Sequence, residues 1–461
     1  MIPRVAIPAS LGLVIAFSAA GADKPVSYYQ DIVPIFKRSC TGCHHAAKLK
    51  GELDITTYTT FKKGGKHGPG FVPGKPKDSI VIDEISGDEP SMPKEGDPLN
   101  KTEVALLTRW IAEGAKDDTP ATAGSYKLTA APEYSQPPVI SALAFSPDGK
   151  LLAVSGYHEV LLHGGADSNI VARLVGECPR IESLAFSPDG KKIAVAGSAP
   201  ARFGEVEIWD AATTGTVLSP VKAFRVSLDS IYGISWSPDG TRLAFGGADK
   251  VVRIITADAG KELVKFENHS DWVFATTWSM DGKRILTGSR DRAMKLIDAS
   301  NGQFIDDINK LLEGVLCFAR HPKEDIVAYG GEMNTTRTYK MAENQGRTAA
   351  NNDSNLQKEF ERMPGPVQAI AYSPDGAAIA VGSVGGEARL YQAKDAKRLA
   401  TFKGHDGAIF AIAFHPTTNW LVTAGFEGTV RVFETAKGSL IRAFQPVPIK
   451  PAPPQQQHAA R

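Results

Sequence analysis

Apolar and polar residues alternate in short runs over most of the chain, from Ile140 to Phe444. Alternation over about four to eight residues is typical of β-strands with one buried face. One such run recurs with the same ending, as in ISALAFSPDG and IESLAFSPDG. Because proline presets φ and glycine accepts a positive φ, the Ser-Pro-Asp-Gly ending predicts a strand followed by a tight turn.

This run opens each of seven repeats, at Ile140, Ile181, Ile231, Val273, Val315, Val367 and Ile409. The steps between them are 41, 50, 42, 42, 52 and 42 residues, and further strand-like stretches such as KKIAVAG and EVEIWD give four strands per repeat. Four strands in about 40–45 residues form a propeller blade, whose faces are buried only when blades stack. The sequence therefore predicts an all-β propeller of seven blades over residues 139–447.

The chain ahead of the repeats has helical spacing instead. Apolar residues recur at Ile32, Ile35 and Phe36, and again at Val104, Leu107 and Ile111. The second stretch predicts a helix over 102–115, with Thr102 or Asn100 as its N-cap. We expect a small all-α domain over residues 23–116, a polar linker over 117–138, and a disordered tail over 448–461.

The small domain contains Cys40-Thr41-Gly42-Cys43-His44, the attachment pattern of a c-type haem. In such a site the two sulfurs form thioethers with the haem vinyl groups, and the adjacent histidine binds the iron. A thioredoxin-like redox pair or half of a zinc site would need no histidine, and no second Cys-x-x-Cys follows. The motif predicts one covalently attached haem c, held by Cys40, Cys43 and His44.

Met92, in Ser91-Met92-Pro93, is the candidate for the distal iron ligand. It is the sole methionine between the haem motif and the linker, and a thioether opposite histidine raises the reduction potential. His67 is the alternative and would give a bis-histidine haem of lower potential. A packing role for Met92 in a turn is the remaining interpretation.

The small domain resembles the haem-binding domain common in planctomycetes and their relatives. The resemblance runs from Tyr29 to about Lys116, through DIVPIFKRSCTGCHH, KGELDI, SMP and LLTRWIAEGA. It implies an all-α, class I-like cytochrome c with His44 and Met92 as axial ligands. Lys94 stands where that family often has a second proline.

The repeats resemble the WD-repeat family in strand pattern but have few of its polar signature residues. Trp209-Asp210 is the one Trp-Asp pair at its position, Gly404-His405 is the one Gly-His pair, and acids occupy the tight turn at Asp249, Asp291 and Glu427. We therefore expect the hydrogen-bonded His–Ser–Asp–Trp network to be incomplete in nearly every blade, and apolar packing to hold the propeller together.

The first 22 residues predict an export signal. Arg4 supplies a positive charge, an apolar stretch runs from Val5 to Ala20, and small residues precede a cleavage site after Ala22. We expect a periplasmic or otherwise exported protein with no membrane span after cleavage. Retention of the segment as an anchor is the alternative.

Composition and the remaining cysteines and histidines argue against two classes of function, nucleic-acid binding and a histidine metal site in the propeller. A formal net charge of +1 gives no support to nucleic-acid binding, and Cys178 and Cys317 are expected to be buried free thiols. Six propeller histidines lack the spacing of a metal site: His158, His163, His269, His321, His405 and His415.

These observations favour a carrier and binding protein over a catalyst. We expect electron transfer through a His/Met haem, with the propeller as a scaffold that docks redox partners not identified by the sequence. The alternatives are an oxidoreductase whose propeller holds a second cofactor or substrate, and a haem-based redox or gas sensor.

Overall fold

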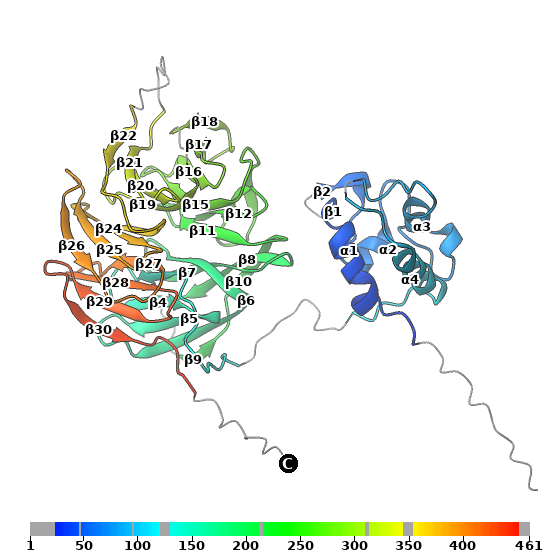
Figure 1. Cartoon of the computed structure of the whole chain (residues 1–461), viewed down its shortest axis with the longest axis horizontal. Coiled ribbons are helices and arrows are strands. Elements are labelled where there is room, and N and C mark those ends of the chain that lie inside the picture. The colour runs from blue at the N-terminus through cyan, green and yellow to red at the C-terminus, as the bar shows by residue number, and fades with distance from the viewer. Residues whose placement is uncertain are drawn as a thin grey trace, which may run out of the picture. The chain divides into compact units, whose positions relative to one another are not determined.

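The computed structural model describes residues 24–45, 48–94, 96–119, 130–211, 215–308, 313–343 and 354–450. The chain forms two compact units, Met1–Ser125 and Tyr126–Arg461 (Figure 1). The predicted export signal lies outside the described residues, as do residues 120–129 of the predicted linker and residues 451–461 of the predicted tail.

The first unit is built from short helices. They are a π-helical turn η1 (Tyr28–Ile32), α1 (Val33–Ser39), η2 (Lys50–Glu52), α2 (Tyr58–Lys63), η3 (Pro76–Asp78), α3 (Ile80–Ile85) and α4 (Lys101–Ala112). The Asn100 side chain accepts the backbone N–H of Glu103 and so caps α4, one of the two caps predicted. The sequence did not predict one feature, the pairing of β1 (His44–His45) with β2 (Lys48–Leu49).

Aromatic side chains form the core of the first unit. Tyr28 stacks on Trp110 with ring centroids 5.2 Å apart, and Phe36 meets Phe61 edge-on at 4.9 Å. Phe71 packs on both Phe61 and Trp110. All five rings are at most 2 % exposed, so the core joins η1, α1, α2 and α4 through rigid, fully buried side chains.

The second unit consists of mainly antiparallel sheets, with one parallel strand pair in the first of them. The first sheet contains β3 (Leu143–Phe145), β4 (Leu151–Ser155), β5 (Tyr157–Gly164), β6 (Ile170–Phe186), β7 (Lys192–Ala199), β8 (Phe203–Asp210), β9 (Gly215–Leu218) and β10 (Lys222–Ser227).

Five four-stranded sheets follow in chain order. They are β11 (Ile231–Trp236), β12 (Arg242–Gly247), β13 (Val252–Thr256) and β14 (Glu262–Phe266); β15 (Val273–Trp278), β16 (Arg284–Ser289), β17 (Met294–Asp298) and β18 (Phe304–Asp307); β19 (Val315–Arg320), β20 (Ile326–Gly331), β21 (Arg337–Lys340) and β22 (Leu356–Glu359); β23 (Val367–Tyr372), β24 (Ala378–Ser383), β25 (Ala388–Gln392) and β26 (Arg398–Phe402); and β27 (Ile409–Phe414), β28 (Trp420–Gly425), β29 (Val430–Glu434) and β30 (Leu440–Phe444).

The eight-stranded first sheet differs from the sequence prediction of two separate four-strand units. The 17-residue strand β6 pairs with β5 through its first part, at Leu174 with Val160, and with β7 through its second part, at Leu184 with Val195. Residues 176–179 join these parts within the same strand, so no loop separates the last strand of one unit from the first strand of the next.

The sheets close into a ring. Their first strands contact one another in the order β3, β6, β11, β15, β19, β23 and β27, and β27 contacts β3 again. At the closure, Ile140, which precedes β3, and Val154 of β4 share a buried cluster with Val422 and Val430 of the last sheet. The Ile140 N–H also donates to the Gly425 carbonyl oxygen at 3.0 Å. Within the described residues, no helix is long and apolar enough to cross a membrane.

Candidate haem-binding site

The Cys-x-x-Cys-His motif forms a tight turn at the end of α1. The Cys40 N–H donates to the Phe36 carbonyl oxygen at 2.8 Å, and this bond ends the helix. The backbone N–H groups of Cys43 and His44 then both donate to the Cys40 carbonyl oxygen at 3.1 Å. The turn therefore keeps both thiols and the imidazole on one short, hydrogen-bonded segment.

The His44 ring is oriented by a backbone contact. Its Nδ1 atom lies 2.9 Å from the Lys50 carbonyl oxygen. A carbonyl oxygen only accepts, so Nδ1 carries the proton and donates, and Nε2 keeps its lone pair. A histidine that binds a metal through Nε2 commonly makes this second contact, which fixes the tautomer and the ring plane.

The two thiols of the motif are free and half-buried. Burial raises the pKa of Cys40 to about 11, against a smaller opposite effect of Arg38. A reactive dithiol instead has a depressed thiol pKa. The environment of Cys40 therefore favours the haem interpretation over a thioredoxin-like redox pair.

Met92 packs on the same aromatic core as Cys40. Its side chain is half-buried, and its N–H donates to the Glu84 carbonyl oxygen at 2.9 Å, which ties its loop to α3. His67 is exposed, in a turn closed by the bridge between Gly65 and Gly68. The choice of Met92 over His67 as the distal ligand stays a prediction.

The residues present fit a covalently bound haem. The segment offers two free thiols, an imidazole nitrogen with its lone pair available, and a half-buried thioether beside one apolar core. The Tyr28 hydroxyl in that core is buried and has no hydrogen-bond partner among the described residues.

The strand-end turns of the propeller show how His415 takes the place that serine has in other repeats. In five turns a serine Oγ donates to the aspartate Oδ1 two residues later, at 2.5–2.7 Å. His415 instead donates through Nε2 to the Gly149 carbonyl oxygen at 3.1 Å, and its Nδ1 accepts the N–H groups of Thr417 and Thr418 at 3.2 Å.

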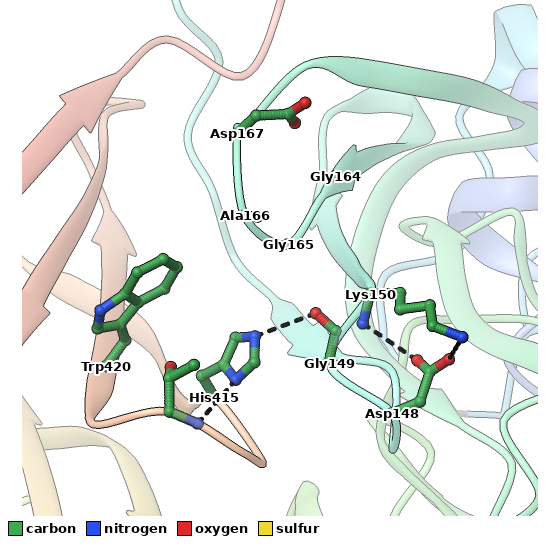
Figure 2. Close-up of a pocket in the computed structure, with 10 residues that line it drawn as sticks. Asp148, Gly149, Lys150, Gly164, Gly165, Ala166, Asp167, His415 and Trp420 are labelled. Carbon is green, nitrogen blue, oxygen red and sulfur yellow. Dashed lines mark hydrogen bonds and ion pairs between the residues drawn. The ribbon is translucent and has the colours of Figure 1, made fainter.

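His415 therefore links the last sheet to the first. It lines a pocket of about 360 Å³ between the turn at Gly149 and the turn at Gly165 (Figure 2). In Figure 2 its ring points at the Gly149 carbonyl group, while Trp420 stands beside it. Its polar contacts are to its own turn and to the turn at Gly149, so its role is structural.

Two other histidines belong to hydrogen-bonded triads that the sequence predicted only in part. His269 contacts Asp291 Oδ2 through Nδ1 and Thr287 Oγ1 through Nε2, both at 2.8 Å. His405 contacts Glu427 at 2.5 Å and Thr423 at 2.6 Å in the same way. The triad of His269 was missed because Asn268 stands where the usual motif has glycine.

Sequence reasoning also missed a buried group in the first sheet of the propeller. Cys178 of β6 and Glu205 and Glu207 of β8 place ligand-type atoms within 4.8 Å of one another. The signal for it was the glutamate pair in EVEIWD, because residues two apart on a strand share a face. Cys178 is buried as predicted, but its neighbours are acidic.

The fold and the motif together define a small helical unit with a haem-attachment sequence, followed by a propeller of WD-type repeats. Residues 40–96 match the family model of planctomycete cytochrome C. The repeats match the WD domain, G-beta repeat at 131–171, the WD40 domain of anaphase-promoting complex subunit 4 at 224–280, and the N-terminal domain of nucleolar protein 10-like proteins at 276–452. Both resemblances seen in the sequence are confirmed.

Similar curated proteins match the chain over short stretches. Periodic tryptophan protein 2 homolog of Dictyostelium discoideum is 32% identical over 77 residues, 16% of this chain and 8% of that protein. WD repeat-containing protein 1 of Gallus gallus is 25% identical over 127 residues, 24% of this chain and 20% of its own. F-box-like/WD repeat-containing protein TBL1X of Mus musculus is 26% identical over 134 residues, 28% of this chain and 25% of its own. The chain thus spans a quarter or less of each of these relatives.

Proposed function

We propose that this protein is an exported c-type haem protein that transfers electrons through one covalently attached haem, with a propeller that docks its redox partners. The observation that carries the proposal is the contact of His44 Nδ1 with the Lys50 carbonyl oxygen, which leaves Nε2 available beside two free thiols. The match of residues 40–96 to planctomycete cytochrome C supports it.

Each residue of the site has one task. Cys40 and Cys43 would attach the haem covalently, and His44 would bind its iron with the ring held by Lys50. Met92 would supply the distal thioether, with His67 as the alternative. The iron would supply reversible one-electron chemistry when bound.

For the second unit, we propose seven blades. In the first sheet, β6 is the fourth strand of one group, with β3, β4 and β5, and the first strand of the next, with β7, β8 and β10, while β9 lies outside both groups. Five four-stranded sheets complete the ring. The closed order of contacts from β3 to β27 and back supports this count.

One face of the propeller offers exposed apolar side chains to a partner. Tyr157, Met333, Val384 and Phe426 follow β4, β20, β24 and β28, the second strand of each group, and are 53%, 45%, 40% and 63% exposed. Second strands of successive blades run in the same direction, so their ends lie on one face. WD-type propellers generally mediate protein–protein contacts, and exposed apolar residues gathered on a face favour docking.

The test is expression of the full chain in the periplasm of a bacterium that matures c-type haem. We expect a low-spin haem spectrum that is reduced and reoxidised reversibly, and export with cleavage after Ala22. The variant Cys317→Ala should keep the spectrum, and Cys40→Ala/Cys43→Ala should lose it. Absence of haem from the wild-type chain in a host that loads other c-type cytochromes contradicts the proposal.

A further inference from the structure

The propeller contains a second cluster of metal-ligating side chains, separate from the haem motif. Among the described residues, Cys178, Glu205 and Glu207 form a group whose ligand-type atoms all lie within 4.8 Å of one another. The three residues are 0%, 3% and 0% exposed. Buried carboxyl and thiol groups of this kind need compensation, since burial penalises an unpaired charge strongly.

Hydrogen bonds within the protein satisfy only some of the carboxylate oxygens in the cluster. Glu207 Oε1 accepts the Glu177 N–H at 2.8 Å, and Glu205 Oε2 contacts Arg225 Nε at 3.2 Å. Glu207 Oε2 and Glu205 Oε1 are buried and have no partner among the described residues. Each glutamate therefore has one matched and one unmatched oxygen.

The charges of the cluster also favour binding of a cation. Arg225 also pairs with Glu177 at 2.8 Å. One guanidinium charge therefore stands against the three carboxylates of Glu177, Glu205 and Glu207. With these three carboxylates and the Cys178 thiolate ionised, the group has a net charge of −3, and a divalent cation would neutralise two of these charges. Without a cation, burial raises the pKa of Glu207 above its usual range.

The backbone around the cluster leaves space for these side chains. A Cβ atom at Gly176 would lie 2.2 Å from Glu207 Oε2, and one at Gly197 would lie 2.7 Å from Cys178 Sγ. Gly197 of β7 is the register partner of Glu205. The strand between β6 and β8 thus has no side chain where the thiol and the carboxylates approach.

We propose that Cys178, Glu205 and Glu207 bind a zinc ion in the propeller, with a water molecule as the fourth ligand. A thiolate with two carboxylates suits a borderline dication such as Zn²⁺ better than Mg²⁺ or Ca²⁺, which prefer oxygen ligands alone. Because the ligands are buried and come from β6 and β8, the ion would hold together the sheet shared by the first two strand groups.

The test uses the full haem-loaded chain, stripped with a chelator, incubated with zinc sulfate and desalted. We expect about one zinc per chain in the wild type and less than about a tenth of that in Cys178→Ser and Glu207→Gln. The matched controls Cys317→Ser and Glu182→Gln, a propeller thiol that is half-buried where the sequence predicted a buried one and a further acid of β6, should retain zinc as the wild type does. Equal zinc in Cys178→Ser and the wild type overturns the site.

A second measurement needs no variant and so does not depend on variant folding. Zinc-edge X-ray absorption of the loaded wild-type chain should show one sulfur at about 2.3 Å and three lighter ligands. Lighter ligands alone would mean adventitious zinc, and a wild-type chain that retains no zinc would mean that protonated Glu207 balances the charge; either result overturns the proposal. Haem iron does not interfere with either measurement of zinc.

Discussion

The Nδ1 atom of His44 lies 2.9 Å from the backbone carbonyl oxygen of Lys50. This contact assigns the ring proton to Nδ1 and leaves Nε2 as the one nitrogen able to bind a metal. It joins the haem motif to the turn at the start of η2, so the ring is held by the backbone. The haem-attachment sequence is therefore accompanied by the local structure that its chemistry requires.

Replacing Met92 by alanine tests the distal ligand. If Met92 binds the iron, Met92→Ala removes the weak methionine-to-iron absorption band and lowers the potential by on the order of 0.1 V, within the ~0.8 V range that axial ligands span. Spectroscopy and redox titration measure both changes. His67→Ala is the matched control and should leave both unchanged; the opposite pattern would make His67 the ligand.

Trp110 tests the aromatic core of the first unit. It is 1% exposed and contacts Tyr28 and Phe71, so Trp110→Ala should destabilise that unit by about 3–5 kcal/mol through lost burial and a cavity. Urea unfolding followed by haem absorption measures this loss. Trp272→Ala, at a site 39% exposed, should leave that transition unchanged. A loss below about 1 kcal/mol for Trp110→Ala contradicts the packing described.

Much of the fold was predictable because its signals are local. The Ser-Pro-Asp-Gly turns reveal the length of the repeat, and the residues Cys40–His44 alone are enough to predict haem attachment. The continuous strand β6 was not predictable, because the sequence repeats are alike whether or not a turn separates them. The group of Cys178, Glu205 and Glu207 was missed because its members meet across two strands, and spacing along the chain does not reveal such contacts.

Closure of the propeller depends on Ile140. This residue is fully buried between the first and last sheets, so Ile140→Ala should cost about 2–5 kcal/mol and lower the melting temperature of the propeller. Calorimetry of the propeller transition measures the effect. The adjacent Val139→Ala is the control, since Val139 is 47% exposed; equal shifts in both variants would contradict closure at this position.

His415 gives the propeller a pH dependence of known sign. Burial lowers the pKa of His415 below its usual range. At a pH between the pKa of His415 in the folded chain and its pKa of about 6.5 in the unfolded chain, the unfolded chain binds a proton that the folded chain does not. The contribution of His415 to the free energy of unfolding is therefore complete above about pH 6.5 and falls as the pH drops below that value. We expect His415→Gln to reduce this slope between about pH 7.5 and 5.5, measured by urea unfolding with a chelator present.

Comparison of His415→Gln with the wild type at each pH removes contributions that both chains share. One shared contribution comes from Glu207. It makes the folding stability fall as the pH rises, opposite to His415, because burial raises the pKa of Glu207 to about 8. His269, held between Asp291 and Thr287, is unchanged in both chains. Identical slopes in the variant and the wild type would contradict a neutral, structural His415.

The central claim is covalent attachment of one haem to Cys40 and Cys43. Mass spectrometry of the mature chain, purified from a periplasm that loads c-type haem and then digested with trypsin, tests it most directly. We predict that the peptide containing both cysteines carries the added mass of one haem and survives acidified acetone, which extracts haem that is not covalently bound. The same peptide at its unmodified mass, with two alkylatable thiols, would contradict the claim.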